Sequence, residues 1–178
     1  MPMLKPAFAL ALVFCTSSIL AADTPVPSDA PEEHQGSRRV VSEMVDNTLL
    51  LHAKDASVHG STVRYEPVPQ KNTLGYWFKQ EDWASWEFEV TKPGTYEVEV
   101  LQGCGKGSGG AEVEVTAGGK ALTFTVEDTG GFQNFVPRKI GTVTLPAGRQ
   151  TLTVKPKTKP GMAVMDLRQV TLHFVEAK

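Results

Sequence analysis

The chain has 178 residues, and its 18 Lys and Arg residues nearly balance 20 Asp and Glu residues, which gives a formal net charge of −2. A chain without a strong positive field lacks the long-range attraction that draws polyanions, so we expect no nucleic-acid partner.

Residues 1–22 have the composition of a secretory signal peptide, with an apolar run over residues 7–14 and small residues at 21–22, where cleavage is expected. The run is shorter than the roughly 20 apolar residues of a membrane-spanning helix, and no later stretch reaches that length. We therefore expect a secreted or periplasmic product with no membrane span. Anchoring through Cys15 is a minor alternative, because Phe14 stands where a lipoprotein signal carries a small residue.

Residues 23–36 are rich in proline, acidic and small residues, which predicts an extended linker. Residues 38–47 fit either an amphipathic helical turn or an opening strand over so short a span. We assign residues 23–47 to the linker and lead-in and residues 48–178 to a folded domain, which at roughly 130 residues is long enough to bury a core.

Apolar residues alternate with polar ones over much of the domain, as in half-buried β-strands. The alternation is clearest over residues 86–90 and 96–100, and the turn at residues 92–95 between them predicts an antiparallel hairpin. Further strands are expected at residues 111–115, 122–126, 143–145, 152–154 and 170–174.

Glycine-containing turns at residues 117–119, 146–148 and 159–161 predict three more tight hairpins. Seven or more short strands without a long helical pattern predict an all-β fold, an antiparallel β-sandwich or jelly roll.

The sequence carries no recognised catalytic motif: it has no Gly-x-Ser-x-Gly, no His-Glu-x-x-His and no phosphate-binding glycine loop. Removal of the signal peptide leaves Cys104 as the one cysteine, so no intramolecular disulfide is expected. Cys104 is either a small buried hydrophobe or an exposed thiol in the glycine-rich loop 103–110. We expect no catalytic residue, no cofactor and no metal.

Three tryptophans, Trp77, Trp83 and Trp86, lie close together in the sequence. Trp86 continues the apolar stripe of its strand, so we expect it in the core with its indole N–H bonded to a neighbour. For Trp77 and Trp83, stacking on a sugar and structural packing are both open, because polar residues that could bind hydroxyl groups surround them.

A second polar and aromatic segment, residues 129–135, is expected to be a loop. Its amides Gln133 and Asn134 could bind sugar hydroxyls, whereas Phe135 is assigned to the core. The candidate carbohydrate-binding residues are Trp77, Trp83, Phe132, Gln133 and Asn134.

Six segments occur in this order: LHAKDASVHG, LGYWFKQEDWASWEFEV, KPGTYEVEV, TGGFQNF, LPAGRQTLTV and MDLRQVTL. Over about residues 49–174 they resemble the galactose-binding-like accessory domains of secreted bacterial sulfatases and α-L-fucosidases, which are relatives of the jelly-roll carbohydrate-binding modules. The resemblance implies a non-catalytic domain with a polysaccharide or glycan as ligand and a secreted sulfatase or glycosidase as partner. The sulfatase signature Cys/Ser-x-Pro-x-Arg is absent, so that activity belongs to another domain.

Many modules of this family hold a structural calcium with a Glu-Ala-Glu segment on the first strand and an Asp near the last. The corresponding positions here are His52, Lys54 and Asp166. Two of the three oxygen ligands are missing, so the resemblance implies no calcium, and Lys54 is expected to pair with Asp166 in its place.

Two kinds of function remain open. The first is a secreted carbohydrate-binding or accessory module for a polysaccharide-degrading enzyme. The alternative is a structural domain that docks on a partner enzyme or envelope protein through the same aromatic loops, and an unrecognised hydrolase ranks third. Sugar binding predicts exposed rings beside amides in a cleft, whereas docking predicts a flatter apolar patch.

Overall fold

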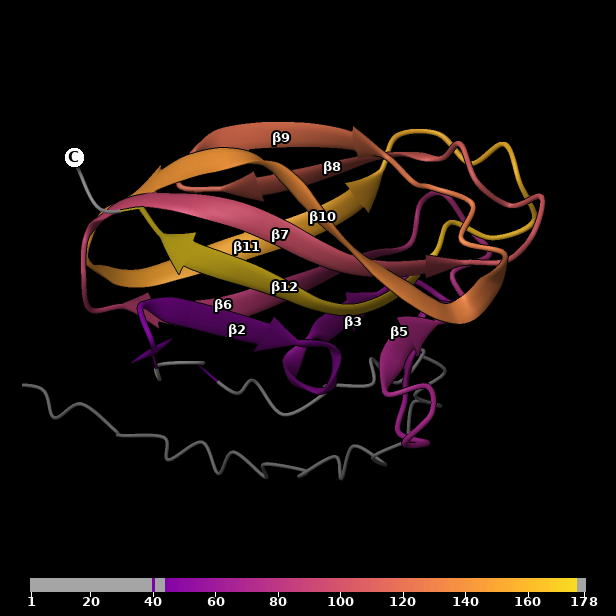
Figure 1. Ribbon diagram of the computed structural model, residues 1–178, viewed down its shortest axis with the longest axis horizontal. Helices are drawn as coiled ribbons and strands as arrows, with labels where there is room; N and C mark the ends of the chain where they lie inside the picture. Colours follow the sequence, from indigo (N-terminus) through magenta and orange to yellow (C-terminus); the bar gives the residue numbers. More distant parts are fainter. Residues whose placement is uncertain (1–39, 41–43, 176–178) are drawn as a thin grey trace, which may run out of the picture. The chain divides into compact units, whose positions relative to one another are not determined.

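The computed structural model describes residue 40 and residues 44–175 (Figure 1). The expected signal peptide at residues 1–22 and the linker at residues 23–36 lie outside these residues. Within them, no helix has the length and apolar character needed to cross a membrane.

The described chain is built almost entirely of strands. In order, the elements are β1 (Met44–Val45), β2 (Thr48–His52), the 3-10 helix η1 (Ala53–Asp55), β3 (Ser57–His59), β4 (Arg64–Glu66), β5 (Thr73–Gly75), β6 (Trp83–Val90), β7 (Gly94–Cys104), β8 (Glu112–Ala117), β9 (Lys120–Thr125), β10 (Gly131–Leu145), β11 (Gly148–Pro156) and β12 (Asp166–Phe174).

The strands form two antiparallel sheets (Figure 1). In the seven-stranded sheet β12 is central: β7 pairs with one edge, and β2 and β5 pair with different parts of the other. β10 pairs with the outer edge of β7, β1 pairs with β2, and β4 pairs with β5. The five-stranded sheet has the order β3-β6-β11-β8-β9. The predicted all-β antiparallel sandwich is confirmed.

The core lies between the two sheets, because the alternation of each central strand places its apolar residues on the inner face. In β6 the residues Trp86, Phe88 and Val90 are buried while the residues between them are half-buried. Trp86 donates its indole N–H to the carbonyl of His52 at 2.8 Å, so its expected place in the core is confirmed.

The turn at residues 92–95 connects the two sheets, so the predicted hairpin between its flanking strands is wrong. β6 pairs with β3 and β11, whereas β7 pairs with β10 and β12. Successive strands show the same alternation whether they pair edge to edge or face each other across a core, so periodicity could not separate the two cases.

Of the other three predicted hairpins, the one at residues 117–119 is confirmed, because β8 pairs with β9 and Ala117 lies opposite Lys120. Those at residues 146–148 and 159–161 are wrong, since β11 pairs with neither β10 nor β12.

The segment at residues 129–135 was expected to be a loop, but Gly131 is already the first residue of β10. The pairing of β10 with β7 is interrupted: Gly131 lies opposite Cys104, and the next partner pair is Val136 with Gln102. The residues between are a bulge, and bulges redirect side chains away from the regular ladder.

Residues 38–47 were predicted to be either a helical turn or a strand, and Met44–Val45 form the strand β1. β1 and β2 are joined by Asp46 and Asn47, whose φ angles of 49° and 60° suit a two-residue hairpin turn. The sandwich therefore includes Met44 and begins before the expected residue 48. The rest of the lead-in, apart from residue 40, lies outside the described residues.

Candidate functional site

A solvent-open pocket of about 130 Å³ lies where β12 begins and where β5 and β7 end. Its lining combines aromatic rings with charged and amide groups. The lining residues are Glu66, Lys71, Tyr76, Phe78, Phe132, Gln133, Ala163 and Asp166.

Two exposed aromatic rings form part of this lining. Tyr76 and Phe78 are 39% and 43% exposed, and their rings meet edge to face with centroids 5.8 Å apart. Tyr76 follows the end of β5 with a φ of 55°, and its carbonyl accepts a hydrogen bond from the backbone N–H of Phe78 at 2.8 Å. The guanidinium of Arg64 lies 3.6 Å from the Tyr76 ring centroid, which fixes this ring in place.

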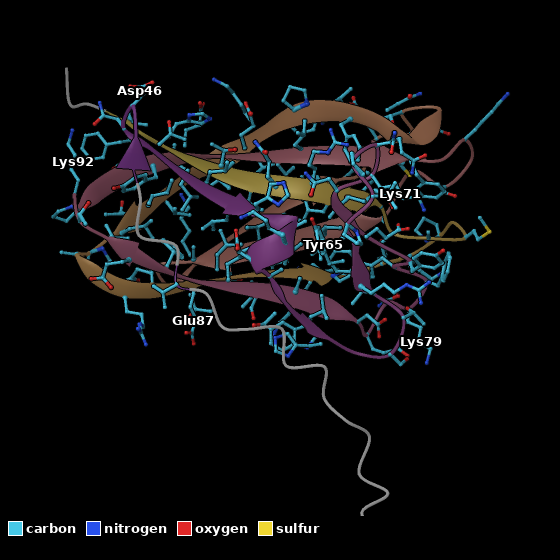
Figure 2. The ribbon with its side chains drawn as sticks, turned by 90° about the horizontal axis from the view of Figure 1, so that it is seen from below. Asp46, Tyr65, Lys71, Lys79, Glu87 and Lys92 are labelled. Carbon is cyan, nitrogen blue, oxygen red and sulfur yellow. The ribbon has the colours of Figure 1, made fainter. Side chains whose placement is uncertain are left out.

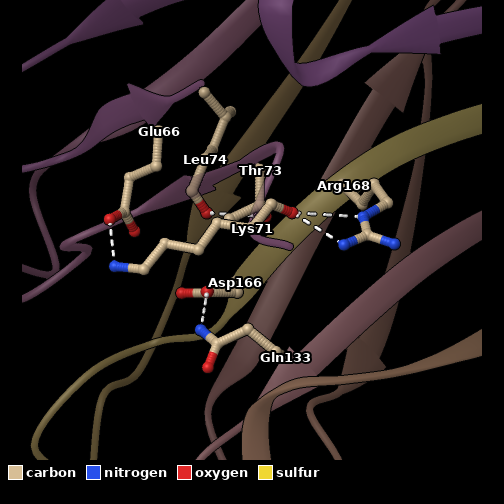
Figure 3. A network of polar contacts seen from close by, with 7 residues as sticks. All are labelled: Glu66, Lys71, Thr73, Leu74, Gln133, Asp166 and Arg168. Atoms are coloured by element: carbon tan, nitrogen blue, oxygen red, sulfur yellow. Dashed lines mark hydrogen bonds and ion pairs between the residues drawn. The ribbon is translucent and has the colours of Figure 1, made fainter. Parts of the chain in front are cut away.

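Asp166, the first residue of β12, is a buried carboxyl group in this pocket and only 5% exposed. Its Oδ2 accepts a long hydrogen bond of 3.4 Å from the amide of Gln133 (Figure 3). Burial and the charge of Glu66 raise the pKa of Asp166 to about 7, although Gln133 and two nearby cations act in the opposite direction. The group therefore titrates near neutral pH.

Glu66 forms an ion pair with Lys71, whose Nζ lies 2.5 Å from Oε2. The other oxygen of Glu66 faces Gly75, where a Cβ atom would overlap Oε1 and would lie 3.2 Å from Oδ1 of Asp166. The absence of a side chain at Gly75 thus allows the two carboxyl groups to approach each other.

Chemically, this pocket offers apolar ring surfaces together with hydrogen-bond acceptors and donors that converge on one small volume. It suits a compact ligand with one apolar face and several hydroxyl groups. Among residues 44–175, no group of three or more His, Cys, Asp or Glu side chains is arranged to hold a metal ion.

Trp77 is not available for stacking on a ligand, because it is fully buried. Its indole N–H donates to the carbonyl of Asp82 at 2.9 Å, and its own carbonyl accepts from the backbone of Val164 at 2.9 Å. Of the two alternatives for Trp77, structural packing is the one that the structure supports.

Trp83 is half-buried on the outer face of the five-stranded sheet and does not line the pocket. His59 stacks on its ring with centroids 3.6 Å apart, and the ammonium of Lys155 lies 4.3 Å from the ring centroid. His59 belongs to β3 and Lys155 to β11, the two strands that flank β6, so side chains of both neighbouring strands contact the indole.

Phe132 and Gln133 line the pocket, and both belong to the bulge of β10. Asn134 is exposed but does not line the pocket, and its amide donates to the carbonyl of Thr129 at 3.1 Å. Phe135, which was assigned to the core, is half-buried beneath the guanidinium of Arg168, 3.8 Å from its ring centroid.

Sequence reasoning missed Tyr76 and Phe78, although the signal was present. They flank Trp77 in one aromatic run, and the chain turns at Tyr76, whose φ is 55°. It also missed Glu66 and Lys71 in the pocket, and nothing in their local sequence marks them.

Lys54 does not pair with Asp166, contrary to the expectation from the resemblance. Its ammonium lies 3.3 Å from Asp55, and its side chain is 49% exposed. Among the described residues, the side chain of Asp166 has the amide of Gln133 as its hydrogen-bond partner.

Cys104 is a buried free thiol, which confirms the small-hydrophobe alternative. Burial raises its pKa to about 11, so the sulfur stays protonated and is a poor nucleophile at neutral pH.

No family model and no curated protein matches the sequence. Solved structures do match the fold. A family 35 carbohydrate-binding module from Clostridium thermocellum has a TM-score of 0.58 and 13% identity, over 72% of this chain and 98% of that one. The C-terminal family 6 module of LamC, a laminarinase from Zobellia galactanivorans, has a TM-score of 0.56 and 20% identity, over 71% and 99%.

A GH26-CBM35 β-(1,4)-mannanase from Podospora anserina also matches, with a TM-score of 0.56, 16% identity and 75% of this chain covered. The match covers only 29% of the mannanase, and only 30% of an exo-β-1,3-galactanase from Phanerochaete chrysosporium. At these identities the likeness shows that the chain has the fold of carbohydrate-binding modules.

Proposed function

We propose that this chain is a non-catalytic carbohydrate-binding module that holds a sugar unit of a polysaccharide or glycan in the pocket at the start of β12. The observation that carries the proposal is the pairing of exposed rings, Tyr76 and Phe78, with the buried carboxyl of Asp166 in one recess. A sugar presents an apolar C–H face and a ring of hydroxyl groups, so it matches both halves of this lining.

The fold shared with family 35 and family 6 modules supports the same proposal. We further propose that the chain is exported and works beside a polysaccharide-degrading enzyme, a sulfatase or a glycosidase. The signal-like composition of residues 1–22 and the sequence resemblance support this part. A docking role is the weaker alternative, because the aromatic residues border a recess with a carboxyl group rather than a flat apolar patch.

The proposal is tested by calorimetric titration with soluble β-1,4-mannan, β-1,3-galactan and laminarin oligosaccharides, before and after Phe78→Ala. Loss of one stacking ring should weaken binding about fivefold, since such contacts contribute about 1 kcal/mol. Leu50→Ala is the matched control, because Leu50 is also 43% exposed but lies outside the pocket lining.

Trp83→Ala should leave the affinity unchanged, because Trp83 does not line the pocket. If no oligosaccharide binds, or if the Phe78 and Leu50 variants lose equal affinity, this site is ruled out. Calorimetry is preferable to indole emission because none of the three tryptophans lines the pocket.

A further inference from the structure

We propose that Asp166 sets the ligand class of the pocket: it accepts hydrogen bonds from hydroxyl groups of a neutral sugar and excludes sugars that carry a carboxylate or sulfate at that position. The inference rests on the proposed carbohydrate site and names the class of sugar that this site takes.

The first argument is the unused hydrogen-bonding capacity of Asp166. An ionised carboxylate can accept about four hydrogen bonds. Asp166 is only 5% exposed, so water has little access to it. Among the described residues, its carboxyl group accepts one side-chain hydrogen bond, from the Gln133 amide at 3.4 Å. Hydroxyl groups of a bound ligand would supply the missing donors.

The second argument is the neighbouring carboxylate of Glu66. It shares the gap at Gly75 with Asp166, where the two carboxyl groups approach each other. An anionic ligand group at this place would add a third negative charge to the cluster, and like charges a few ångströms apart in a buried site repel strongly.

The third argument is that the nearby cations already have partners. Lys71 pairs with Glu66 at 2.5 Å, and Arg168 donates to two backbone carbonyls at 2.8 and 2.9 Å. Arg64 lies on the ring of Tyr76 and is not part of the lining. Among the lining residues, two are acids and one is a base, so the pocket does not present a free cation to an anionic sugar.

The protonation of Asp166 makes the inference testable by pH. Burial and Glu66 raise its pKa to about 7, and from β7 the neighbouring Cys104 stays a neutral thiol. A hydroxyl donates a stronger hydrogen bond to a carboxylate than to a neutral acid. The affinity for a neutral sugar should therefore rise from pH 6 to pH 8, whereas the affinity for an acidic sugar should fall.

The experiment compares ligand pairs that differ only at carbon 6, the hexamers of β-1,4-mannose and β-1,4-mannuronate, and those of β-1,4-glucose and β-1,4-glucuronate. Calorimetric affinities are measured at pH 6 and pH 8 on the full chain. At pH 8 we expect a neutral hexamer to bind at least about fivefold more tightly than its acidic counterpart, because Asp166 and Glu66 repel the carboxylate at carbon 6.

Asp166→Asn keeps the shape of the side chain and removes its titration. This variant should lose the pH dependence and should discriminate less between the two members of a pair. Asp46→Asn is the control, because Asp46 is an exposed carboxylate at the end of the sandwich opposite Lys71 (Figure 2). If the Asp166 variant fails to fold, the unmodified chain still tests the inference. Its affinity for the neutral hexamers should rise from pH 6 to pH 8 while its affinity for the acidic hexamers falls.

An acidic hexamer that binds at pH 8 as tightly as its neutral counterpart would overturn the inference and leave the carbohydrate site standing. If neither these hexamers nor the mannan, galactan and laminarin oligosaccharides bind, the proposed function fails and the inference fails with it.

Discussion

Asp82 and Asp166 are both buried, but their environments are opposite. Asp82, 1% exposed, accepts hydrogen bonds from the backbone of Ser61, Thr62 and Val63 and from the Thr62 hydroxyl. Burial alone would raise the pKa of Asp82, but these hydrogen bonds lower it below its usual value. Asp166 has one long hydrogen bond and a raised pKa. The contrast indicates a structural role for Asp82 and a ligand-facing one for Asp166.

Asp82→Ala should lower the free energy of unfolding by about 3 kcal/mol, because it leaves three backbone N–H groups without their acceptor, and the N–H group of Val63 is buried. Urea denaturation at pH 7 measures this loss. Asp46→Asn should change the stability by less than about 0.5 kcal/mol, as surface substitutions usually do. Similar values for the two variants would contradict the structural role of Asp82.

Asp166→Asn should behave in the opposite way, because ionisation of Asp166 opposes folding. The folded pKa of about 7 lies above the unfolded one, so the folded state holds the proton more tightly between about pH 4 and pH 7. Over that window the unmodified chain should lose up to about 1.4 kcal/mol per pH unit relative to the variant. Thermal unfolding at pH 5 and pH 8 tests this, and a constant difference between the two proteins would refute it.

At the scale of elements, the hairpin of β8 and β9 shows how a tight turn restricts which residue types can occupy it. Gly118 and Gly119 have φ angles of 56° and 73°. A Cβ at Gly118 would also overlap the carbonyl oxygen of Thr144, whereas Gly119 faces open space. The two positions therefore share the backbone requirement and differ in packing.

Gly118→Ala should destabilise the protein by about 2–3 kcal/mol, from a left-handed backbone and a clash with β10. Gly119→Ala should cost only about 1 kcal/mol, because only the backbone strain applies. The difference between their urea unfolding free energies isolates the packing contribution. Equal losses would mean that the neighbouring strand moves aside.

Most strands could be predicted from the sequence, but of their pairings only that of β8 with β9 was predicted correctly. The residue that marks the connection before β7 is Tyr96, which the alternation of apolar and polar residues does not single out. Its hydroxyl donates to the carbonyl of Lys92, four residues upstream, at 2.5 Å. Such a tyrosine contact holds the corner where a chain passes between two sheets. Periodicity records only which face is buried, so it leaves the choice between a hairpin and a corner open.

The pocket was less predictable than the fold. Phe132 and Gln133 could be predicted because they lie in a segment that combines aromatic rings with amide side chains. Asp166 and Glu66 lie far apart in the sequence, and they come together because β5 pairs with β12 on one side and with β4 on the other. That pairing is a property of the folded sheet.

At the scale of the whole described sandwich, the pocket lies at one end of β12, and the first strand β1 and the last described residue, Val175, lie at the other. Asp166 is the first residue of this nine-residue strand and lies in the pocket, and Phe174 is its last residue, roughly 25 Å away. There the backbone N–H of Phe174 donates to the carbonyl of Asn47 at 2.9 Å, so the described chain enters and leaves at nearly the same place. Figure 2 shows Asp46 and Lys92 at this end and Lys71 at the other.

This arrangement decides how the molecule can be attached. A support, a tag or a neighbouring domain joined before Met44 or after Val175 starts from the end far from the pocket. Coupling through either end should therefore leave the recess facing outward, and the length of β12 provides clearance for a long polymer to pass across it. A bead or sensor chip that carries the chain by one end should retain the full binding capacity, whereas coupling through Lys71 should block it.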